Sequence, residues 1–274
     1  MRPAFMRAGT WLHAGRYVGA VMSDLPRRNG WTIARQVGDR SPDRTQRLLN
    51  RAAWDTSAAM SAVRRFAVAD LDQAARRAGR RRGLAAGALD ETGQEKKGLA
   101  TAGVKRQRLG CAGGTENGIS TVHLSYIREG AGHALIGARQ WIPAEQIDDP
   151  ATSLVMALPL DLKFAAKGQL AIEIPGDAFG DGAGVDFVAG DEVYGNCTGL
   201  REYLEGEGQA YVLRVPSNFR EPWPAVSRSP APRLSGRCWP MTGGGRSAPP
   251  GRAPRASAGT PGRTSPPPRS GTAC

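Results

Sequence analysis

The sequence predicts an α/β protein with an N-terminal helical region, a mixed sheet and a C-terminal tail that lacks a core. Three observations carry this prediction. Apolar residues recur at helical spacing up to about residue 83, and short apolar runs then alternate with glycine-rich turns up to residue 220. From residue 221 onward Pro and Gly accumulate and large apolar side chains almost disappear. The expected domains are therefore residues 1–83, 84–220 and 221–274.

The helical region contains two clear helix signals. Ser41 can cap a helix whose first turn accepts Pro42, and Leu48, Leu49 and Ala52 supply an apolar stripe. A second helix is expected over residues 57–77, with one apolar side made of Met60, Val63, Ala67, Val68 and Leu71.

Residues 32–50 resemble a helix-turn-helix, because Ala34 and Gly38 have the spacing that a tight turn needs. In that arrangement, however, the second helix would place Arg44 and Arg47 at positions that are normally buried and apolar. Two interpretations therefore stand: a helix that reads the major groove of DNA, or a plain helical hairpin.

The second region is expected to form strands at residues 84–89, 119–127, 134–142, 185–189 and 209–215, with a helix at 198–206. The run 119–127 alternates well, and Gly130 and Gly132 suit a hairpin turn between it and 134–142. Strands of this kind mixed with helices indicate a mixed α/β sheet.

Residues 221–274 hold twelve Pro, eight Gly and eight Arg but only one acidic residue, Glu221. Such a segment buries too little apolar surface to offset the entropy of ordering, so we expect a disordered tail, translated out of frame from a GC-rich gene. It contributes +7 of the formal net charge of +12. The remaining +5 fits a nucleic-acid partner and fits a solvated basic surface equally well.

Several classes of protein are excluded. The four cysteines form no CxxC pair and the three histidines have no zinc-ligand spacing. No apolar run approaches the roughly 20 residues that span a bilayer, and arginines interrupt the N-terminal apolar residues, so no signal peptide is expected. These features predict a cytoplasmic protein with no membrane partner.

Two acids are candidates for chemistry. Asp90 and Asp191 each follow a short apolar run, and carboxylates held at strand ends can share divalent metal ions such as Mg²⁺. Two such ions, roughly 3.5–4 Å apart, can activate a nucleophile and stabilise the leaving oxygen in phosphodiester transfer. The alternative is structural, because aspartate at a strand end is common in turns and helix caps.

A series of segments resembles the DDE transposases of the insertion-sequence 701 family: RNGWT at 28–32, GDRSP at 38–42, QRLLNR at 46–51, DETG at 90–93, GVKRQ at 103–107, ENG at 116–118 and GDEVYG at 190–195. The resemblance covers about residues 25–220. It implies a ribonuclease H-like core in which Asp90 ends the first strand and Asp191 the fourth. It also implies catalysis with Mg²⁺ or Mn²⁺, DNA as partner and a homodimer on DNA ends.

The sequence then departs from that family. The third acid, a glutamate on a late helix, is missing, and Glu221 stands before Pro222, where it is no substitute. We therefore expect an incomplete core, weakly bound metal and little or no strand transfer. A non-catalytic remnant that binds the ends of insertion sequences is the alternative function.

Basic residues near the expected turns are candidates for contacts with DNA phosphates. The cluster before the sheet could equally be a solvated linker. The candidates are Arg80, Arg81, Arg82, Lys96, Lys97, Lys105 and Arg106.

Overall fold

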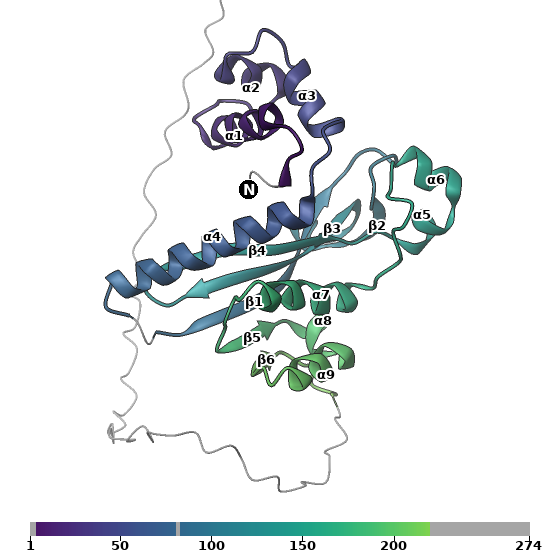
Figure 1. The fold of residues 1–274 in the computed structure, drawn as a ribbon. Coiled ribbons are helices and arrows are strands. Elements are labelled where there is room, and N and C mark those ends of the chain that lie inside the picture. The colour runs from purple at the N-terminus through teal and green to yellow at the C-terminus, as the bar shows by residue number, and fades with distance from the viewer. Residues whose placement is uncertain (1–3, 81–82, 220–274) are drawn as a thin grey trace, which may run out of the picture. The chain divides into compact units, whose positions relative to one another are not determined.

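The computed structural model describes residues 4–80 and 83–219 (Figure 1). A helical region comes first, as predicted, and it consists of α1 (Ala8–Met22), α2 (Gly30–Val37), α3 (Asp43–Asn50) and α4 (Thr56–Arg77). The side chain of Asn29 starts α2 by accepting hydrogen bonds from the backbone N–H groups of Trp31 and Thr32, both at 3.0 Å. Gly38 ends α2 in the left-handed conformation, with φ of 80°.

The start and the register of α3 differ from the predictions. Pro42 is the N-cap residue, and Ser41 donates its hydroxyl to the Asp43 carboxylate at 2.7 Å without capping the helix. Leu48 is buried, but Leu49 is 53% exposed, because consecutive helical residues point about 100° apart and only one can face the neighbouring helices. Thr45 is the other buried residue of α3. Arg44 and Arg47 therefore lie on the exposed side, not at the buried positions expected for them in a helix-turn-helix, and both interpretations of residues 32–50 stay open.

The second region forms a mixed sheet, as predicted, and this sheet has six strands among the described residues. Its strands are β1 (Ala85–Glu95), β2 (Lys105–Leu109), β3 (Gly114–Arg128), β4 (Gly132–Gln140), β5 (Phe187–Gly190) and β6 (Tyr211–Leu213). The order is β2-β3-β1-β5-β6, with β4 also paired to β3. Pairs among β1 to β4 are antiparallel, whereas β1, β5 and β6 run parallel.

Three differences from the expected strands have a common cause. β2 was not predicted, β1 extends past Leu89 to Glu95, and β3 begins at Gly114. The added residues are mostly polar or glycine, so they show no apolar alternation. They are strand because β3 hydrogen-bonds to β1 from Ala85 to Glu95 and to β2 from Lys105 to Leu109. The tertiary pairing overrides the weak local preference.

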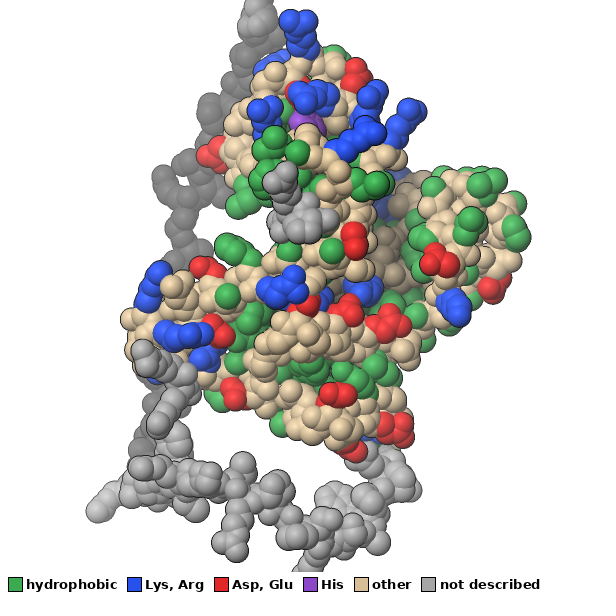
Figure 2. Space-filling view, viewed as in Figure 1, with side chains coloured by type: hydrophobic (Ala, Val, Ile, Leu, Met, Phe, Trp, Pro, Cys, Tyr) green, Lys and Arg blue, Asp and Glu red, His purple; other side chains and the backbone are tan. Residues whose placement is uncertain are grey.

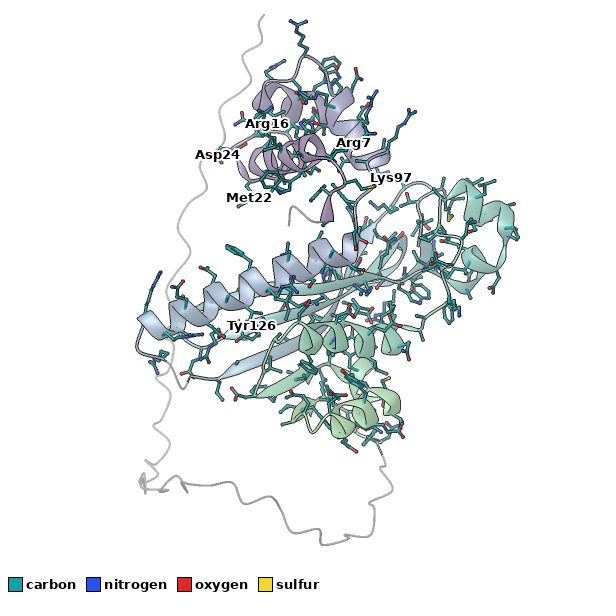
Figure 3. The ribbon with its side chains drawn as sticks, viewed as in Figure 1. Arg7, Arg16, Met22, Asp24, Lys97 and Tyr126 are labelled. Carbon is teal, nitrogen blue, oxygen red and sulfur yellow. The ribbon has the colours of Figure 1, made fainter. Side chains whose placement is uncertain are left out.

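One face of the sheet carries the core. Leu89, Val122, Leu124 and Val188 pack there against α7 (Lys167–Gly180) and α9 (Thr198–Gly206). Three of the predicted apolar residues of α4, Ala67, Val68 and Leu71, pack on the same cluster. Tyr126 lies on β3 (Figure 3), and its hydroxyl donates to the Asp72 carboxylate of α4 at 2.8 Å. Apolar residues of the other face stay in contact with solvent: Ile127 is 41%, Leu135 58% and Val212 64% exposed.

A buried arginine fastens α4 to the sheet domain. Arg64, 3% exposed, donates to the carbonyl oxygens of Ile136 and Asp177, both at 2.8 Å, and forms an ion pair with Asp181. Ser61 donates to the same carboxylate at 2.6 Å. The remaining short elements are η2 (Gly110–Ala112), α5 (Ala144–Asp148), α6 (Pro150–Val155) and α8 (Glu192–Gly195).

Candidate active site

The parallel pairing of β1 with β5 brings the two predicted acids together. Leu89 pairs with Gly190 at the last position of this register, so Asp90 and Asp191 are the next residues of two neighbouring strands. Adjacent strands lie about 4.8 Å apart, which places the two Cα atoms within reach of a shared ligand. The two aspartates therefore lie on neighbouring strands where the parallel part of the sheet ends.

The strand positions of both acids differ in detail from those implied by the resemblance. Asp90 does not end β1, because the strand continues to Glu95 against β3. It marks only the end of the segment that pairs with β5. Asp191 follows β5, which is the fifth strand along the chain because the unpredicted β2 precedes it.

Both carboxylates are exposed and locally oriented. One oxygen of Asp90, Oδ1, accepts the backbone N–H of Glu91 at 2.7 Å. Oδ1 of Asp191 accepts the backbone N–H of Val193 at 3.0 Å and so caps α8. Asp191 is therefore a helix cap, which is the structural role considered above as the alternative. The Oδ2 atom of each aspartate has no hydrogen-bond partner among the described residues and can accept a further ligand.

A histidine that the sequence analysis passed over lies beside Asp90. In the antiparallel register of β1 and β3, His123 stands directly opposite Asp90, so the two side chains project from the same face about 5 Å apart at Cβ. The Nδ1 atom of His123 is buried and has no hydrogen-bond partner among the described residues. Only the strand register places His123 here; its spacing from other histidines carries no such signal.

Beneath the aspartates, on the covered face, lies a second set of polar groups. Glu91 forms an ion pair with Lys167 at the start of α7 and accepts the Ser120 hydroxyl at 3.1 Å. The Tyr194 hydroxyl is buried there without a hydrogen-bond partner in the described part of the chain. Burial raises the pKa of Tyr194, and the negative charges of Glu91, Asp191 and Asp90 raise it further. The negative charges of three carboxylates therefore act on this hydroxyl.

The donor set suits a hard divalent cation but is small. Mg²⁺ prefers carboxylate oxygen, water and substrate phosphate, and the Oδ2 atoms of Asp90 and Asp191 supply oxygen of that kind. Within residues 4–80 and 83–219, no group of three or more His, Cys, Asp or Glu side chains is arranged to hold a metal ion. Glu221, the remaining acid of the C-terminal segment, lies outside the described residues.

The predicted phosphate contacts do not gather at the aspartates. Lys96 and Lys97 follow the far end of β1, and six extended residues place Lys96 about 20 Å from Asp90. Arg106 on β2 lies at that same end, because Asn117 pairs with it and donates to the carbonyl oxygen of Lys96 at 2.7 Å.

Two of the other predicted contacts are partly neutralised. Lys105 forms an ion pair with Glu145 at 2.5 Å, and Arg80 one with Glu129 at 3.4 Å. Arg81 and Arg82 lie outside the described residues.

Comparison with known proteins gives one match. A family profile described as DDE superfamily endonuclease matches residues 2–265, which include Asp90 and Asp191. No curated protein and no solved structure matches. The match continues past residue 220, so the truncation expected there stays a prediction. No helix in the described part of the chain has the length and apolar character to cross a bilayer. Because the profile spans nearly the whole sequence, this chain belongs to the DDE superfamily of endonucleases.

Proposed function

We propose that this DDE endonuclease is a transposase-type protein related to the insertion-sequence 701 family, with Asp90 and Asp191 as its metal-binding carboxylates. One observation supports this most strongly: the β1–β5 register makes the two acids neighbours at the end of paired parallel strands. Neighbouring carboxylates at such a position are what metal-assisted phosphodiester cleavage requires. A nuclease of this superfamily acts on DNA.

Different parts of the fold orient the two aspartates. Asp191 is oriented by the hydrogen bond that caps α8, and Asp90 by the ladder of β1 between β3 and β5. Mg²⁺ or Mn²⁺ bound to both would act as a Lewis acid on a phosphate oxygen and generate a nucleophilic hydroxide from water. His123 lies opposite Asp90 on the same sheet face and would limit the movement of its side chain.

Two carboxylates make an incomplete set for this chemistry. The metal would be held with fewer protein ligands and less fixed geometry, and a displacement of about 1 Å in a reacting group can lower a rate on the order of 100-fold. We therefore infer weak metal binding, slow DNA cleavage and little or no strand transfer. The order of the motifs supports the insertion-sequence 701 relation, with ancestral cleavage and strand transfer.

A non-catalytic DNA-binding protein is the second candidate function. Exposed arginines on α3 favour it, since they lie away from the carboxylates and need no metal. Such a protein would bind insertion-sequence ends and compete with intact copies of the transposase.

The experiment that separates the two functions uses the full chain and DNA carrying insertion-sequence ends, with Mn²⁺. The catalytic proposal expects slow metal-dependent nicking that Asp90→Asn and Asp191→Asn both abolish, while Glu95→Gln, an exposed acid of the same strand, cleaves normally. Nicking that survives both substitutions would refute the assignment of the site. Efficient joining of the ends would refute the inferred incompleteness, and specific binding of ends without any nicking would establish the second function.

A further inference from the structure

We propose that the pocket between α1 and α3 binds a backbone phosphate of DNA. The pocket has a volume of about 580 Å³ and lies within the N-terminal helices. Four arginines line it: Arg7, Arg44, Arg47 and Arg51. DNA as the occupant rests on the proposed function, but the pocket itself is distant in sequence from the carboxylates and needs no metal.

The arginines come to one place because of helical spacing. Arg44, Arg47 and Arg51 are three and four residues apart, which puts them on one side of α3 and its last turn. Arg7 directly precedes α1 and faces the same pocket (Figure 3). Figure 2 shows basic side chains gathered over the N-terminal helices. The register that leaves Leu48 buried is the one that turns these arginines outward.

The charge of this pocket is only partly compensated. Arg44 pairs with Asp39 at 2.9 Å, which holds the guanidinium in place. Arg7, Arg47 and Arg51 form no ion pair with any described residue. Asp43 is the single acid among the lining residues, and it already accepts the Ser41 hydroxyl. Three guanidinium groups without an ion pair among the described residues therefore line the same pocket. A guanidinium matches phosphate oxygens in geometry and charge.

A buried histidine at the wall has one ring nitrogen left for a ligand. His13 lines the pocket and is 6% exposed; its Nε2 lies 3.5 Å from an Asp39 carboxylate oxygen, and its Nδ1 has no hydrogen-bond partner within the described chain. Burial lowers its pKa and outweighs the charge of Asp39, and Arg44 and Arg16 lower it further. With the single proton of the neutral imidazole on Nδ1, that N–H can donate to a phosphate oxygen that enters the pocket.

The size and the lining favour a DNA backbone over a free anion. A volume of about 580 Å³ exceeds what a lone phosphate fills, and part of the lining is apolar, from Met6, Leu48, Ala52 and Ala53. A sugar beside the phosphate would cover this apolar part. Contacts of this kind form with DNA of any base sequence. The pocket therefore contributes affinity and positions the helices on the duplex without recognising bases.

The test measures binding of the full chain to a fluorescent duplex of arbitrary sequence, in EDTA, over a series of salt concentrations. Arg47→Gln/Arg51→Gln should weaken binding and lower the slope of log affinity against log salt by about 2, since each phosphate contact contributes about 0.9. The matched control, Arg27→Gln/Arg35→Gln, removes the same charge from exposed positions outside the pocket. It should change the slope by much less.

Equal slopes in the pocket variant and the control would overturn the proposal. So would displacement of wild-type DNA complexes by inorganic phosphate beyond the effect of chloride at equal ionic strength, because that assigns the pocket to a free anion. The imidazole resonances of His13 should shift on duplex binding, and unchanged resonances would also count against it. Because EDTA removes the metal, loss of the pocket effect is distinguishable from failure of the carboxylate site, which the Asp90→Asn nicking assay tests separately.

Discussion

Charged residues on the two faces of the central sheet have different environments. On the covered face, Glu91 is paired with Lys167, and Arg64 joins Asp181 to two backbone carbonyl groups. On the other face, Asp90 is exposed and has a free carboxylate oxygen. Asp90 and Glu91 are consecutive residues with the same charge, yet strand alternation gives one a structural environment and the other an open one. The position of a charged side chain relative to the core therefore decides whether it stabilises the fold or is available for chemistry.

The largest expected effect concerns Arg64. Arg64→Ala should lower the free energy of unfolding by about 3–5 kcal/mol, because it removes a buried ion pair with Asp181 and two hydrogen bonds to backbone carbonyl oxygens. Urea unfolding followed by circular dichroism measures this. Arg65→Ala is the control, since Arg65 contacts the same carboxylate at 2.9 Å but its side chain is 58% exposed. It should lower stability by less than about 1 kcal/mol. Equal losses would break the distinction between buried and exposed charges.

A smaller effect is expected at Glu91. Glu91→Gln removes the ion pair with Lys167, while its amide oxygen can still accept the Ser120 hydroxyl. We expect a loss of about 1–2 kcal/mol in urea unfolding, for a charge-assisted hydrogen bond that is partly buried. Asp90→Asn, on the open face of the same strand, should leave stability nearly unchanged. A more destabilising Asp90 variant would contradict the comparison between the faces.

The smallest expected effect is a pH dependence at Asp181. The hydrogen bond from Ser61 is the main cause of a lowered pKa at this carboxyl, and Arg64 and Arg65 lower it further. The carboxylate therefore stabilises the fold fully above its unfolded pKa of about 3.9, and this contribution is lost as pH falls through the lower folded pKa. Ser61→Ala should flatten the fall in urea midpoint across this acidic window. An unchanged profile would show that Ser61 does not tune the carboxyl.

Sequence patterns predicted the fold best where apolar periodicity was strong. The helix expected at 198–206 is α9 with the same bounds, and the two apolar runs before the aspartates became β1 and β5. The patterns failed where long-range pairing decides structure, as in polar β2 and the polar end of β1. They gave no sign that Arg64 is buried, because an arginine within a helix is expected to be exposed unless its carbonyl partners on β4 and α7 are known.

The candidate site was predictable in part for the same reason. Motif order pointed to Asp90 and Asp191, but only the parallel register makes them neighbours. His123 required the antiparallel register of β3, and the pocket arginines required the rotation of α3 about its axis. Each of these depends on residues far apart in the chain, which local spacing does not encode.

The most direct test of the central claim is a Mn²⁺ titration followed by electron paramagnetic resonance, which counts free metal without any need for catalysis. Wild-type protein should show weak, saturable binding that Asp90→Asn and Asp191→Asn each remove. Asn at position 191 can still cap α8, so the fold should be retained in both variants. Glu95→Gln should bind as the wild type does. If the double variant Asp90→Asn/Asp191→Asn keeps the wild-type isotherm, these two aspartates are not the metal site.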